Sequence, residues 1–93
     1  MTDNTTEMTQ DNLLARIEAL LFVASAPATA SQIGEALSIS IKEVESALAE
    51  LQNEYGGKRG IAIQSHGGRY QLTTSAVFAE DVERFIGIES TAK

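Results

Sequence analysis

Side chains that could do chemistry are few and isolated in this sequence. His66 is the single histidine, cysteine is absent, and no carboxylate or second histidine neighbours His66. Metal sites usually need three or four ligands, and nucleophilic catalysis needs a nucleophile paired with a base. The run G-G-K-R-G at residues 56–60 lacks the preceding strand and following helix of a phosphate-binding loop. We therefore expect no catalytic residue, no metal ligand and no cofactor, and we predict that the chain is not an enzyme.

The charge of the chain limits which macromolecules it can bind. Lysine and arginine together number 7, against 13 aspartates and glutamates, so the formal net charge is −6. Affinity for duplex DNA or an acidic membrane depends heavily on cations that neutralise phosphates. No apolar run is long enough to span a bilayer, and the polar, acidic start of the chain does not resemble a secretory signal. Binding to DNA or membranes by charge alone is therefore expected to be weak.

The length of 93 residues suffices for one domain with one modest core. Residues 1–9 are predicted to be a disordered lead-in, residues 10–87 the folded domain, and residues 88–93 a linker toward a missing second domain. A first helix is expected over residues 10–24, where apolar residues recur at helical spacing. Those residues are Leu13, Ile17, Leu20, Leu21 and Ala24. Pro27 disfavours helical conformation at the residue before it and so ends this helix.

Two capping boxes mark the next two helices. Thr29 with Gln32 opens a short helix over residues 30–37, and Ser40 with Glu43 opens a third helix. In the third helix, apolar residues follow at spacings of four, three and four until the glycine pair at 56–57 ends it. Only three residues separate these two helices, which predicts a helix-turn-helix.

After the third helix, apolar and polar residues alternate, as is typical of β-strands. Ile61 and Ile63 alternate with polar residues, as do Tyr70 and Leu72, and Gly67-Gly68 between them suits a two-residue hairpin turn. A last helix is expected over residues 76–86, capped by Thr74 or Ser75 and ended by Gly87. The predicted fold is α+β and mostly helical: a winged helix-turn-helix with about four helices and a two-stranded wing.

The third helix of this fold usually enters the DNA major groove, but here most of its outward charged residues are negative, like the DNA backbone itself. Lys42 is accompanied by Glu43, Glu45, Glu50 and Glu54. Lys58, Arg59 and Arg69 are expected to cluster around the wing, and we favour the interpretation that they solvate a glycine-rich turn. The alternative is a DNA-binding transcription regulator that contacts phosphates through Lys42 and these three cations.

The first helix is unusual for its apolar character, because residues 20–24 are apolar on almost every side. A helix of this kind must be covered on every side. The cover comes either from the rest of the domain or from a second protein or second copy of the chain. In the second case, the predicted dimer or partner interface contains Leu14, Phe22, Val77 and Phe78.

Three segments resemble one known family. They are L-L-A-R-I-E-A-L-L-F-V-A at residues 13–24 with the turn S-A-P-A-T after it, G-G-R-Y-Q-L-T-T at residues 67–74, and F-A-E-D-V at residues 78–82. They are similar to the first helix, the wing and the following helix of bacterial segregation and condensation protein B. The first segment is fairly specific, and the resemblance runs from about Leu13 to Phe85.

The resemblance implies a function that the residues alone do not. Members of that family have two tandem winged-helix domains, form homodimers and bind a kleisin subunit, segregation and condensation protein A. The kleisin bridges the heads of an SMC ATPase in a cytoplasmic, nucleoid-associated complex that condenses and partitions the chromosome. The resemblance therefore implies a non-catalytic adaptor. The acidic charge of the chain adds the expectation that it has no membrane partner and that direct nucleic-acid binding is unfavourable. The chain stops at Lys93, before any second domain, so we interpret it as a fragment.

Overall fold

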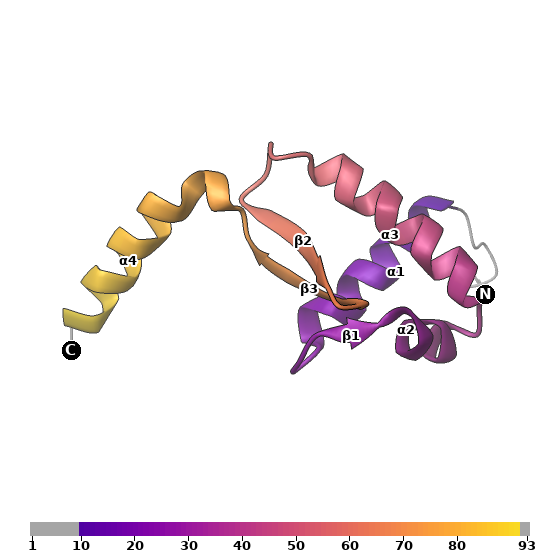
Figure 1. Ribbon diagram of the computed structural model, residues 1–93. Helices are drawn as coiled ribbons and strands as arrows, with labels where there is room; N and C mark the ends of the chain where they lie inside the picture. Colours follow the sequence, from indigo (N-terminus) through magenta and orange to yellow (C-terminus); the bar gives the residue numbers. More distant parts are fainter. Residues whose placement is uncertain (1–9, 92–93) are drawn as a thin grey trace, which may run out of the picture.

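The predicted fold class is confirmed. The computed structural model describes residues 10–91, in which four α-helices, one 3-10 turn and a three-stranded antiparallel sheet follow one another (Figure 1). The lead-in predicted for residues 1–9 lies outside the described residues. The helices are α1 (Gln10–Val23), α2 (Ala30–Leu37), α3 (Ile41–Tyr55) and α4 (Ala79–Thr91). The other elements are β1 (Ala28–Thr29), β2 (Ile61–His66), β3 (Arg69–Thr74) and η2 (Ala76–Phe78).

The core lies where α1, α2, α3 and the sheet meet. Ile17 of α1 and Val44 and Leu48 of α3 are the largest side chains that are fully buried. Helix α3 contacts α1, α2 and β2, so it is the central element of the body. The remaining core residues come from all of these elements: Leu14, Leu21, Ala30, Ile33, Ala47, Leu51, Tyr55 and Ile63.

Local hydrogen bonds set the ends of α2 and α3 where the sequence predicts them. The Thr29 hydroxyl accepts from the Gln32 amide at 3.1 Å, and the Ser40 hydroxyl accepts from the Glu43 amide at 3.0 Å. Both reciprocal side-chain bonds of the capping boxes are also present. Gly56 takes a left-handed conformation, with φ of 44°, and ends α3. The helix-turn-helix is thus specified largely by residues next to its own turns.

The hairpin has the predicted two-residue turn, and a third strand extends the sheet. Gly67 and Gly68 have φ of 59° and 78°, as a type I′ turn requires. Ile63 pairs with Leu72, so the apolar residues of both strands share one face. Strand β1 was not predicted from the sequence; it pairs antiparallel with β3 and places β3 at the centre of the sheet. Two residues are too few to show the alternation that identifies a strand.

Helix α4 projects from the body instead of packing on it (Figure 1). Ser75 caps η2 as predicted, but the prediction that Gly87 ends the last helix is wrong, because α4 continues to Thr91. Gly87 lacks a positive φ, and glycine inside a helix costs only about 1 kcal/mol. No residue of α4 is buried. The radius of gyration is 15.7 Å, against about 12 Å for a compact domain of this length. That residues 88–93 lead to a second domain stays a prediction.

Candidate protein-binding surface

The outer face of α3 has the acidic character that the sequence predicts. Lys42, Glu43, Glu45, Glu50 and Glu54 are all exposed. Gln52 of the same helix is half-buried, and its side-chain amide donates to the Ile63 carbonyl at 3.2 Å. A helix that presents four carboxylates and one ammonium group repels a phosphate backbone.

The cations predicted to cluster around the wing lie at opposite ends of it. Lys58 and Arg59 precede Ile61, where β2 begins, whereas Arg69 pairs with His66 beside the turn at the other end of the hairpin. The intervening strand spans about 17 Å at its usual rise per residue. The expected cluster is therefore wrong, because an extended hairpin separates residues that a compact loop would bring together.

Arg59 instead lies near acidic groups between α1 and α3. The Tyr55 hydroxyl donates a hydrogen bond to the Glu18 carboxylate, and these residues line a shallow recess with Arg59 and Glu54. Burial raises the pKa of Tyr55 to about 12, helped by this hydrogen bond and by the negative charge of Glu18, while Arg59 acts in the opposite direction. This arrangement ties two core helices together and leaves Arg59 among carboxylates.

His66 and the carboxylates form no metal-binding group in the part of the chain that the structure describes. His66 is exposed on β2, opposite Arg69. Within residues 10–91 there is no group of three or more histidine, cysteine, aspartate or glutamate residues placed to hold a metal ion. None of the described helices combines the length and apolar character needed to cross a membrane. The surface features left to explain are apolar.

The predicted interface residues divide into two groups. Phe22 is 79% exposed and Val77 is 68% exposed, and Phe78 is also exposed. Leu14 is only 4% exposed and belongs to the core, so the prediction that it projects outward is wrong. Residue 14 lies one turn before Ile17 and two turns before Leu21, and all three share the side of α1 that faces the body.

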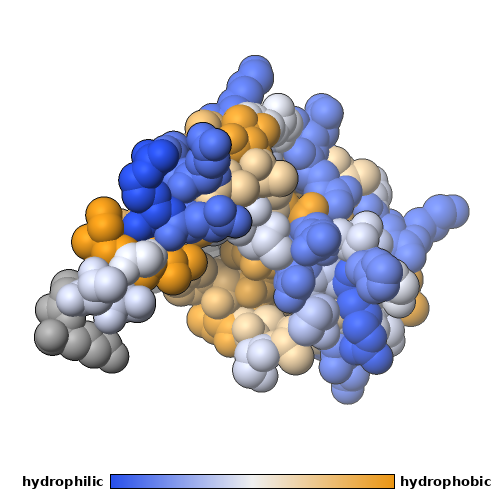
Figure 2. Space-filling view, turned by 60° about the vertical axis from the view of Figure 1, so that its left-hand side comes forward, coloured by the Kyte–Doolittle hydropathy of each residue, from blue (hydrophilic) through white to orange (hydrophobic). Residues whose placement is uncertain are grey.

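Further large apolar residues are exposed that were not predicted to lie on a surface. They are Val23 at the end of α1, Ile61 at the start of β2, and Phe85, Ile86 and Ile88 in α4. Their apolar character was visible in the sequence, but their exposure depends on the direction in which α4 leaves the body. Figure 2 shows apolar surface on the projecting helix and on the neighbouring body, with charged side chains of the helix on another side.

A groove lies in the body beside the base of this helix. Its volume is about 450 Å³, and it runs between the end of α1, the segment 24–27 and the two long strands. Leu21, Phe22, Pro27, Ile61 and Leu72 supply its apolar lining, and no charged residue lines it. An uncharged, largely apolar groove beside exposed aromatic residues is typical of a surface that binds another polypeptide.

Known proteins share both the sequence and this architecture. Residues 15–93 match the family model of segregation and condensation complex subunit ScpB. Segregation and condensation protein B of Alkaliphilus oremlandii is 43% identical over 68 residues, which cover 72% of this chain and 37% of that protein. Its counterpart in Moorella thermoacetica is 36% identical over 83 residues, covering 88% of this chain and 43% of that protein. The chain thus spans less than half the length of these curated relatives.

Two solved structures are similar over most of the chain. The crystal structure of ScpB from Mycobacterium tuberculosis superposes with a TM-score of 0.85 and 28% identity, over 94% of this chain and 55% of that one. The crystal structure of a dimer of the ScpB N-terminal domain complexed with ScpA peptide gives a TM-score of 0.74 and 31% identity, over 81% of this chain and 95% of that one. With its winged-helix fold and its matched residues 15–93, the chain belongs to the family of segregation and condensation complex subunit ScpB.

Proposed function

We propose that this chain is a non-catalytic adaptor of a bacterial condensin-like SMC–kleisin complex, acting in chromosome condensation and partition. It forms a homodimer and binds the kleisin subunit, segregation and condensation protein A, which connects it to the SMC ATPase. Family membership supports this role, as does the similarity to a ScpB N-terminal domain that was crystallised as a dimer with ScpA peptide. A cytoplasmic location beside the nucleoid follows from the same role.

The observation that carries the proposal is the uncovered apolar surface around the groove. Phe22 and Phe85 are each more than half exposed, and the groove between α1 and the wing contains no charged side chain. Isolated apolar residues are common on protein surfaces, but exposed aromatic residues together with an uncharged, largely apolar groove indicate an interaction site. The acidic face of α3 adds a second argument, because it makes polypeptide a better partner than DNA.

The alternative of a DNA-binding transcription regulator has lost its structural basis. It required Lys42, Lys58, Arg59 and Arg69 to act together, but the hairpin separates Arg69 from the other two wing cations. Lys42 lies among exposed carboxylates on α3. The family to which the chain belongs is a segregation and condensation subunit.

Solution mass and DNA titration test the proposal together. Light scattering on the full chain, from low to high concentration, is expected to show a dimer that persists in high salt, because apolar contacts are not screened as charges are. Fluorescence anisotropy with duplex DNA at low salt is expected to show little binding, whereas a labelled peptide of the organism's own ScpA binds. A strictly monomeric chain, or tight DNA binding that collapses as salt is added, would overturn it.

A further inference from the structure

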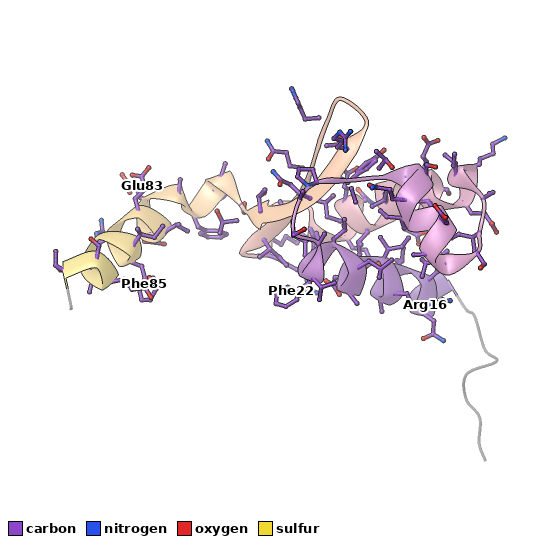
Figure 3. All side chains as sticks on the ribbon, turned by 90° about the horizontal axis from the view of Figure 1, so that it is seen from below. Arg16, Phe22, Glu83 and Phe85 are labelled. Atoms are coloured by element: carbon purple, nitrogen blue, oxygen red, sulfur yellow. The ribbon has the colours of Figure 1, made fainter. Side chains whose placement is uncertain are left out.

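Helix α4 is an amphipathic helix whose apolar side is uncovered. Val82, Phe85 and Ile86 lie at spacings of three and one, so they fall on one side of the helix. Phe85 and Phe22 point to the same side of the molecule, while Glu83 points to the opposite side (Figure 3). The helix thus offers an apolar side in the direction in which the body also exposes an aromatic ring.

The joint between the body and α4 is held firmly. Ser75 is 4% exposed; its amide donates to the Gly60 carbonyl at 2.8 Å, and its carbonyl accepts from the Phe78 amide at 3.0 Å. Its hydroxyl also accepts from the Val77 amide at 3.3 Å. These bonds direct α4 away from the groove of its own chain (Figure 1). The joint would have to break for α4 to fold back, so the groove and the helix need an occupant from elsewhere.

A second copy of the chain supplies both missing surfaces at once. Each copy has one groove and one projecting helix, and a two-fold axis pairs each with its counterpart reciprocally. No charged side chain lines the groove, so it accepts the side of α4 around Phe85 and Ile86 without charge repulsion. Glu80, Asp81 and Glu83 lie on other sides of that helix. Thr74 lines the groove and Ser75, the next residue, begins the joint, so the groove ends next to the segment from which α4 leaves the body.

The exposed area is large enough for a stable dimer. Eight large apolar side chains are exposed on α4, on the joint before it and on the body near the groove, and together they present roughly 800 Å², given that an aromatic side chain buries 150–250 Å² and an aliphatic one somewhat less. They are Phe22, Val23, Ile61, Val77, Phe78, Phe85, Ile86 and Ile88. A standard specific interface buries about 800 Å² on each partner.

We propose that the homodimer forms by reciprocal docking, with α4 of each copy lying in the groove between α1 and the wing of the other copy. This inference rests on the proposed homodimer and adds its contact surface. The docking and the proposed homodimer can be tested separately, because a dimer formed through another face would agree with the proposed function and contradict the docking.

A charge placed on the apolar side of α4 tests the contact energetically. Phe85→Asp in the full chain is expected to weaken dimerisation at least tenfold, because the contact would bury a carboxylate among apolar groups. Ile41→Asp is the matched control, since Ile41 is also an exposed apolar residue but lies at the start of α3. Neither change touches the core, so circular dichroism is expected to show the parent fold. Equal dimerisation constants for both variants and the parent would overturn the docking.

Crosslinking tests the geometry of the contact. The chain contains no cysteine, so only the introduced cysteines can react. Ser25 lines the groove, and Glu89 follows Phe85 and Ile86 by one turn on the same side of α4. A Ser25→Cys chain mixed with a Glu89→Cys chain is expected to give a covalent dimer with a short bismaleimide. The control replaces Glu89→Cys with Glu83→Cys, on the opposite side of α4 (Figure 3), and is expected to give much less.

The double variant Ser25→Cys with Glu89→Cys distinguishes exchange between copies from folding back. Crosslinks between two chains support the docking, whereas a crosslink within one chain shows that α4 fills its own groove and refutes it. A dimer by mass that yields no such crosslink refutes the docking alone. A parent chain that is monomeric by mass refutes both the docking and the proposed homodimer.

Discussion

Replacing Gly34 by alanine tests the packing of the helix-turn-helix. Gly34 is buried in α2, and its carbonyl accepts a hydrogen bond from the Ile39 amide at 3.0 Å. A Cβ atom added at residue 34 would lie 2.8 Å from the Ile39 carbonyl oxygen and 3.5 Å from a methyl group of Val44. The first distance is shorter than a carbon–oxygen contact allows, and the opposing atom belongs to the backbone. The turn between α2 and α3 must therefore shift.

Two opposing effects determine the magnitude of this change. Alanine is favoured over glycine inside a helix by about 1 kcal/mol. Overpacking a tight site costs about 1–3 kcal/mol, and loss of the Ile39–Gly34 hydrogen bond adds about 1 kcal/mol. The net destabilisation is therefore about 2 kcal/mol, which lowers the melting temperature of a domain this small by roughly 8–16 °C.

Thermal unfolding followed by circular dichroism measures the effect, with Gly87→Ala as the matched control. Gly87 is also inside a helix, but a Cβ atom there meets nothing within 4 Å. Gly87→Ala is expected to raise the helical signal without lowering the melting temperature. A Gly34→Ala variant at least as stable as the parent would refute the packing argument, since helix propensity would then outweigh the close contact.

Three further changes probe the body of the domain. Tyr55→Phe is expected to cost about 1 kcal/mol at neutral pH, because the hydrogen bond to Glu18 is lost. Burial raises the pKa of Tyr55 from 10.0 to about 12, so the free energy of unfolding of the parent falls as the pH rises from 10 to 12. The phenylalanine variant has no hydroxyl to ionise, so it should not show this fall in urea titrations at several pH values. Ser40→Ala removes the cap of α3 and should cost about 1 kcal/mol in thermal unfolding, whereas Ser46→Ala on the exposed side of α3 should not destabilise. Ile17→Ala, at a side chain that is 0% exposed, should cost about 3 kcal/mol in chemical denaturation, and a loss below 1 kcal/mol would contradict its central place in the core.

Features determined by neighbouring residues could be predicted from the sequence. Thr29 and Ser40 cap the helices that follow them through hydrogen bonds to residues three positions away. Gly67 and Gly68 permit the tight turn because glycine adopts positive φ without steric penalty. In each case the residues that make the interaction lie within one turn of each other, so their spacing alone identifies it.

Features that depend on the placement of distant elements could not be predicted in the same way. Leu14 was assigned to the surface because α1 has apolar residues on almost every side, and only the position of α3 and the sheet decides which of them are covered. The separation of Arg69 from Arg59 depends on the length of the paired strands. The exposure of Phe85 depends on the direction of α4, which the hydrogen bonds of Ser75 determine.

The short strand β1 affects how the groove receives its occupant. Ala28 pairs with Tyr70 of β3, so backbone hydrogen bonds join the segment that forms one wall of the groove to the strand that forms the other. Both walls therefore keep their spacing before anything binds. A preorganised site of this kind loses little conformational entropy on association. It also discriminates between helices by shape, because a wider groove would require β1 to separate from β3.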